Sequence, residues 1–95
     1  MKQNLSEKTL GIIHASHITI KAMEPYIERY IPEVQIMHLC DDTIQRDNIR
    51  AGAGVIPKVN YYKFAQYAHN LEEAGADLIL LACSTFNYAA ELGRP

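Results

Sequence analysis

The run from Gly75 to Asn87 constrains the fold of this 95-residue chain most strongly. It contains a glycine turn, then an unbroken apolar segment over residues 78–83, and then two hydroxyl residues. An apolar run of this length between turn signals is typical of a strand that is buried on both faces of a parallel sheet. We therefore predict a strand at Asp77–Ala82, with Cys83 at its carboxyl end and a further helix over Thr85–Leu92.

The rest of the chain predicts an alternation of strands and helices. Residues 10–15 and 33–40 have the character of strands, whereas residues 17–31 and 57–74 carry apolar side chains at helical spacing. We expect a polar, mobile loop over residues 41–54. The order of elements predicts an α/β fold of the flavodoxin-like type, with a short parallel sheet in the strand order 2-1-3 and helices on both faces.

The helical spacing also predicts which side chains are buried. In the first helix the apolar face includes Tyr30, and Pro25 predicts a kink or a restart. Pro57 suits the first turn of the second helix, and Gly75 ends that helix. The expected buried face of the second helix is Tyr61, Phe64, Ala65, Ala68 and Leu71.

Composition narrows the range of partners. Apolar residues make up 48% of the chain, charged residues 21%, and the net charge is -2, with lysines and arginines scattered along the sequence. Without a basic stripe we expect no nucleic-acid partner. The longest apolar run is too short to cross a membrane, and residues 1–8 are polar and lack the apolar core of a secretory signal. We therefore expect a cytoplasmic protein with a flexible N-terminus over residues 1–8 and no membrane partner.

Cysteine usage supports the same compartment. Cys40 and Cys83 are too few for a disulfide framework, and neither belongs to a C-x-x-C motif. The four histidines show no metal-ligand spacing with these cysteines, so we expect no metal site. Cys83 differs from an ordinary buried cysteine because a strand-to-helix switch follows it. Backbone N–H groups and the helix dipole at such a switch favour a thiolate and bind anions.

Three segments carry a resemblance to a known family. The segment Ala74–Thr85 resembles the first cysteine motif of the aspartate/glutamate (hydantoin) racemase superfamily. Residues Gly11–Ala15 are similar to that superfamily's first strand and loop. Val55–Lys58 is similar to its loop before the cysteine strand, most closely in an uncharacterised branch. The resemblance spans residues 10–92, and only the cysteine motif in it is moderately specific.

The resemblance implies a mechanism that uses no cofactor. Members of the superfamily have two α/β halves, and each half presents one cysteine that removes or returns a proton at the carbon next to a carboxylate. Here Cys83 would be the acid/base. Ser84 and Thr85 would hold the carboxylate of a small amino-acid-like substrate, while His14 and Ser16 would line the pocket. Glutamate racemases carry an Asp-Ser pair at the first strand, where this chain has His14-Ala15-Ser16.

The second half of that fold is missing from these 95 residues. We therefore expect residues 1–95 to be a single, truncated N-terminal half-domain, inactive alone and prone to self-association or homodimer formation. Cys40 cannot replace the missing thiol, because in a 2-1-3 sheet it approaches from the same side as Cys83, roughly 10 Å away. Two alternatives stay open: a one-cysteine decarboxylase or hydrolase of the same superfamily, and a non-catalytic module that binds small carboxylates.

Overall fold

The three expected strands form one parallel sheet. In the computed structural model, which describes residues 4–52 and 55–82, β1 (Thr9–His14) pairs with β2 (Gln35–Cys40) on one side and with β3 (Leu78–Ala82) on the other. The strand order is β2-β1-β3. The predicted flavodoxin-like α/β arrangement with strand order 2-1-3 is therefore confirmed.

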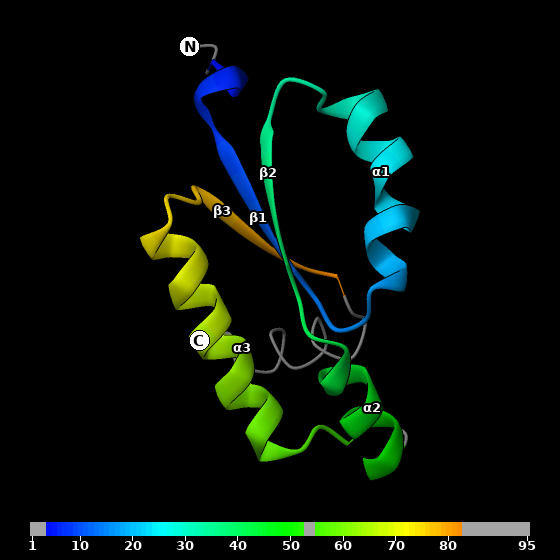
Figure 1. Ribbon diagram of the computed structural model, residues 1–95. Helices are drawn as coiled ribbons and strands as arrows, with labels where there is room; N and C mark the ends of the chain where they lie inside the picture. Colours follow the sequence, from blue (N-terminus) through cyan, green and yellow to red (C-terminus); the bar gives the residue numbers. More distant parts are fainter. Residues whose placement is uncertain (1–3, 53–54, 83–95) are drawn as a thin grey trace.

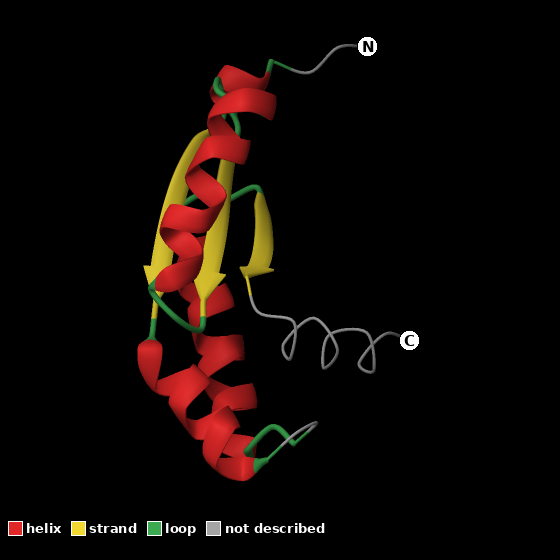
Figure 2. Ribbon diagram, turned by 90° about the vertical axis from the view of Figure 1, so that its right-hand side faces the viewer, coloured by secondary structure: helices red, strands yellow, loops and turns green. Residues whose placement is uncertain are grey.

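Helices cover both faces of this sheet. α1 (Ile18–Tyr30) lies on one face and α3 (Lys58–Glu73) on the other, which gives three layers (Figures 1 and 2). α2 (Asp42–Ala51) lies beyond the carboxyl ends of the strands, and a short 3-10 turn, η1 (Leu5–Glu7), precedes β1. The third predicted helix, over residues 85–92, falls outside the described residues.

The main core lies between the sheet and α3. Ile13 of β1 is fully buried and packs in one cluster with Leu81 of β3 and Leu71 of α3. The close approach of α3 to β1 depends on Gly11, because a Cβ atom there would lie 3.0 Å from Cδ1 of Leu71. The opposite face of β1 carries His14, whose ring points toward α1 and contacts Thr19.

The prediction of a loop over residues 41–54 is wrong, because most of this segment forms α2. Asp41 caps the helix, since its side chain accepts a hydrogen bond from the backbone N–H of Thr43. Ile44 is fully buried and joins the core cluster. The cap at the start of the helix and one buried apolar residue thus stabilise a helix here, although the segment is mostly polar.

The prediction of which α3 residues form its buried face is partly wrong. Tyr61 is 42% exposed and Ala65 is also exposed, whereas Asn60 is fully buried. The amide of Asn60 donates to the carbonyl of Ile44 (3.2 Å) and to Oδ1 of Asn48 (2.9 Å), so contact with α2 turns the first part of α3 away from the predicted face.

The buried position expected for Tyr30 is wrong, and α1 does not restart at Pro25. Tyr30 was expected on the buried face but is 66% exposed, because α1 ends there, beside the turn that leads into β2. The helix contains Pro25 and continues past it as one element from Ile18 to Tyr30, without a restart.

The end of α3 follows the prediction for Gly75. This residue has a φ of +103°, and its N–H donates to the carbonyl of Glu72 (3.0 Å) while the N–H of Ala76 donates to the carbonyl of Leu71 (2.9 Å). These two bonds form a Schellman motif, which favours glycine at the residue with positive φ. The turn directs the chain into β3.

Candidate functional site

The carboxyl ends of the three strands lie level with one another. His14, the last residue of β1, pairs with Cys40 of β2 on one side and with Ala82 of β3 on the other. In parallel α/β sheets this edge is the usual location of ligand sites. Cys83 follows Ala82 directly in the sequence, but the predicted roles of Cys83, Ser84 and Thr85 fall outside the described residues.

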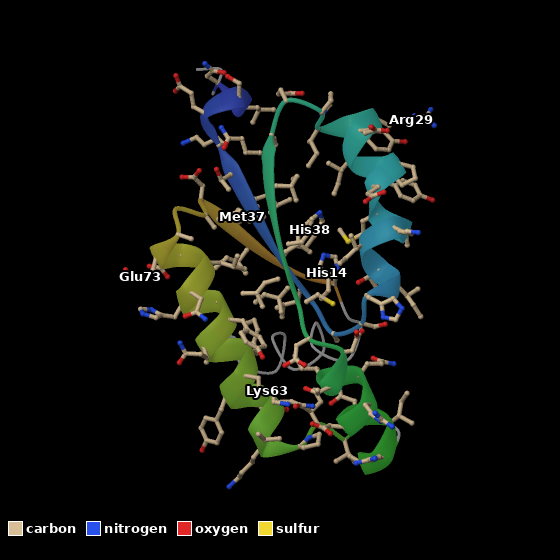
Figure 3. All side chains as sticks on the ribbon, viewed as in Figure 1. His14, Arg29, Met37, His38, Lys63 and Glu73 are labelled. Atoms are coloured by element: carbon tan, nitrogen blue, oxygen red, sulfur yellow. The ribbon has the colours of Figure 1, made fainter. Side chains whose placement is uncertain are left out.

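His14 is a fully buried imidazole with both ring nitrogens engaged. Its Nδ1 lies 2.5 Å from Oγ1 of Thr19, and its Nε2 lies 2.8 Å from Nδ1 of His38. The two imidazole rings have their centroids 4.9 Å apart, and they lie together between the strands and α1 (Figure 3). Burial, and then the charge of His38, lower the pKa of His14, which favours its neutral form.

Ser16 lies in the turn between β1 and α1, and its surroundings are polar. The carbonyl of Ser16 accepts a 2.9 Å hydrogen bond from the hydroxyl of Thr19. The hydroxyl of Ser16 accepts a long hydrogen bond, 3.4 Å, from the N–H of Ile18. The side chain is half-buried. Ser16 therefore lies at the expected edge of the sheet, and its carbonyl fixes the orientation of the hydroxyl that contacts His14.

An exposed pair of hydrogen bonds connects the turn after β1 to α2. Oδ1 of Asp42 accepts hydrogen bonds from the backbone N–H of His17 (2.7 Å) and from its Nδ1 (2.9 Å). The backbone hydrogen bond, followed by the side-chain bond, lowers the pKa of Asp42. The contact positions the start of α2 against the loop that carries Ser16.

Asp41 anchors a second polar cluster at the same edge. Its Oδ1 accepts from the N–H (2.9 Å) and hydroxyl (2.5 Å) of Thr43, and its Oδ2 accepts from the hydroxyl of Tyr67 (2.5 Å). The ammonium group of Lys63 donates to Oγ1 of Thr43 (2.8 Å). Burial acts to raise the pKa of Asp41, but the hydrogen bonds from Thr43 and Tyr67 and the charge of Lys63 outweigh it and lower that pKa.

Cys40 lies at the end of β2, on the exposed edge of the sheet. Partial desolvation, and then the charges of Asp42 and Asp41, raise the pKa of its thiol. β1 separates Cys40 from β3, as the strand order requires. The environment of Cys40 therefore favours an unreactive thiol.

Sequence reasoning missed three residues of this edge: His38, Thr19 and Tyr67. The sequence indicates His38 only indirectly, because alternation along β2 places it on the same face as Cys40. Thr19 and Tyr67 contact their partners only through tertiary packing, and no local pattern in the sequence indicates either contact.

The described residues offer no metal centre and no membrane span. Across residues 4–52 and 55–82, no group of three or more His, Cys, Asp or Glu side chains could hold a metal ion. Over the same residues, no helix combines the length and the apolar character needed to cross a bilayer. Comparisons of the chain with protein-family models, with curated proteins and with solved structures found no match.

Proposed function

We propose that this chain is one half of a cofactor-independent racemase or isomerase that transfers a proton at the carbon next to a carboxylate. The observation that carries the proposal is the register of the sheet, in which Ala82 pairs with His14 at the carboxyl edge. Cys83 is the next residue along the chain. A thiol at this edge suits proton transfer because its pKa is tunable toward the working pH.

The proposal gives each residue of the cysteine motif a role. Cys83 is the acid/base, and Ser84 and Thr85 hold the substrate carboxylate. Ser16 lines the pocket from the β1 side. His14 serves as a positioning residue that does not touch the substrate, because it is fully buried and both of its ring nitrogens are engaged. A second half supplies the opposing acid/base, so the 95-residue chain alone does not racemise.

The exchange of α-protons tests this proposal. The protein that includes both halves would be incubated in deuterated buffer with the D and L forms of aspartate and glutamate and with a 5-substituted hydantoin. We expect exchange with at least one of these probes, its loss in Cys83→Ala, and its retention in the matched variant Cys40→Ala. Unchanged exchange in Cys83→Ala would overturn the role of the cysteine.

The mass of the native gene product tests the two-half arrangement. The 95 residues have a mass of 10.7 kDa. A native mass roughly twice as large is expected for two α/β halves. A native mass equal to that of this chain would contradict a covalent second half.

A second candidate function is a module that binds small carboxylates without catalysis. The engagement of both His14 nitrogens favours it, because neither nitrogen is left to deprotonate a thiol. The rates of alkylation of Cys83 and Cys40 across pH separate the two functions. An acid/base thiol reacts at a lower pH than Cys40, whereas a module without catalysis gives Cys83 an ordinary profile. A one-cysteine decarboxylase would instead release carbon dioxide without inverting a stereocentre.

A further inference from the structure

A groove of about 310 Å³ lies between α1 and β2, on the face of the sheet opposite the main core. α1 contributes Lys21, Glu24 and Glu28 to its lining, and β2 contributes Ile36 and His38. Its volume lies within the range of small-ligand sites. His38 connects this groove to the buried imidazole of His14.

The hydrogen-bond partners fix the position of every proton in this connection. A backbone carbonyl only accepts, so the 2.9 Å contact with Ser16 uses the hydroxyl proton of Thr19. Oγ1 of Thr19 must then accept from Nδ1–H of His14, which leaves Nε2 of the neutral His14 as an acceptor. Nδ1 of His38 therefore donates to His14, and Nε2 of neutral His38 carries no proton.

The unprotonated nitrogen of His38 belongs to an exposed side chain that lines the groove. His14 keeps this tautomer in place, because a buried imidazole with a lowered pKa stays neutral and continues to accept. Thus the relay Thr19–His14–His38 gives the groove a hydrogen-bond acceptor of fixed orientation.

The charges around the groove favour a cation. Within the described residues, no ion pair joins Lys21 to Glu24 or Glu28. With His38 neutral, the lining carries two carboxylates and one ammonium group, so its net charge is negative. Ile27 and Ile36 add an apolar part to the same lining.

We propose that this groove binds a primary ammonium group on a short alkyl chain, with Nε2 of His38 and the carboxylates of Glu24 and Glu28 as acceptors. The alkyl chain lies against Ile27 and Ile36. An ammonium group has three donors, which matches three acceptors, and hydrogen bonds with ionised partners are the stronger kind. The inference does not depend on the proposed racemase function, because no residue of the cysteine motif takes part.

Protonation of His38 makes its side chain unfavourable for binding an ammonium group. It turns the Nε2 acceptor into a donor and adds a positive charge beside Lys21. The titratable groups that face His38 are His14 from β1, Lys21, Glu24 and Glu28 from α1, and Cys40 two residues along β2. Ammonium binding should therefore be weaker with His38 protonated than with His38 neutral.

The binding test uses n-butylammonium as the probe, with n-butanol and butyrate as matched comparisons, on the 95-residue chain at pH 8 by NMR chemical-shift titration. We expect n-butylammonium to bind at residues of the groove, and His38→Phe to weaken it about tenfold or more, as loss of a charged hydrogen bond implies. The matched variant His69→Gln changes an exposed histidine on α3 and should leave binding unchanged. Equal binding of butanol and butylammonium, or equal binding by His38→Phe and the unmodified chain, would overturn the proposal.

A second variant tests the relay itself. Thr19→Val removes the acceptor for Nδ1–H of His14, which frees that proton to move to Nε2 and forces the tautomer of His38 to change. We expect the imidazole nitrogen shifts of His38 to report a proton on Nδ1 in the unmodified chain and on Nε2 in Thr19→Val, with weaker butylammonium binding. A proton on Nε2 of neutral His38 in the unmodified chain would contradict the relay.

A third probe distinguishes the source of the ammonium group. Nα-acetyl-lysine N-methylamide carries the same group on a peptide backbone. Tighter binding of this probe than of butylammonium would identify a lysine side chain of another protein as the ligand, and the reverse would identify a free amine. Failure of both ammonium probes would overturn the site, whatever the outcome of the proton-exchange assay on Cys83.

Discussion

The hydroxyl of Tyr67 donates a 2.5 Å hydrogen bond to Oδ2 of Asp41, and this bond joins the middle of α3 to the residue that caps α2. The other oxygen of Asp41 is engaged by Thr43. Asp41 also follows β2 directly. One carboxylate therefore connects a strand end and two helices at the edge of the sheet where ligands are expected.

Tyr67→Phe should destabilise the fold by about 1.5–3 kcal/mol, the usual contribution of a hydrogen bond to a charged group. Urea denaturation would measure the free energy of unfolding. The matched control is Tyr62→Phe on the same helix, where the side chain is 72% exposed and the free energy should change by less than about 0.5 kcal/mol. Equal effects of the two substitutions would show that the bond to Asp41 adds nothing.

The same bond predicts two limits of pH stability. The pKa of Asp41 in the folded state is below its ordinary value of 3.8. The carboxylate therefore stabilises the fold fully above pH 3.8, and this stabilisation is lost as the pH falls through the folded-state pKa. The pKa of Tyr67 is raised from 10.0 to about 12. The stabilisation of the fold by its hydroxyl is therefore complete below pH 10 and is lost as the pH rises toward 12. Denaturation midpoints across pH should show both losses, and Tyr67→Phe should abolish the alkaline one.

Gly11→Ala should destabilise the protein by about 1–3 kcal/mol, because the added Cβ meets Cδ1 of Leu71 at 3.0 Å and Cβ of Ala76 at 3.2 Å. Thermal denaturation would measure the loss. A double-mutant cycle with Leu71→Ala provides the control, since the shorter side chain removes the 3.0 Å contact with Cδ1 and leaves the 3.2 Å contacts with Cβ of Leu71 and of Ala76. If the two effects add without coupling, the contact between Gly11 and Leu71 does not limit the approach of α3.

Alkylation of Cys40 should be slow, and removal of one nearby charge should accelerate it. In a Cys83→Ser background, Asp42→Asn removes a carboxylate that raises the pKa of Cys40, so the rate with iodoacetamide at pH 8 should rise roughly two- to fivefold. Asp47→Asn is the matched control, because Asp47 pairs with Lys63 and does not act on Cys40. Equal rates for the two variants would contradict the electrostatic cause.

Apolar runs and turn residues are enough to predict the strands and their order. The polar composition of residues 41–54, in contrast, led to the prediction of a loop where the structure has α2. The segment 41–54 has few apolar residues, and its helix depends on the cap at Asp41, on Arg50 in the last turn and on Gly52 after it. These end signals are present in the sequence. What the sequence could not indicate is that Ile44 would become a fully buried core residue, because this depends on the docking of α2 against α3.

The paired histidines show a different limit of sequence reasoning. His14 was expected at the sheet edge, where the structure has it, but its partner was not foreseen. Contact between His14 and His38 depends on the register in which His14 pairs with Cys40, and a shift of one residue would put His38 on the opposite face. The role of Cys83 was predicted from the same edge and stays a prediction.

The central position of β1 determines how the sheet can assemble. Thr9 is bonded to Asp77, 68 residues away, whereas its partner on the other side is Gln35. Loop closure is costlier over the longer separation, so β1 and β2 are expected to associate first, with α1 as the crossover between them. During synthesis one edge of β1 then stays open until the ribosome has released β3, and in that interval the nascent chain is most exposed to pairing with the wrong strand.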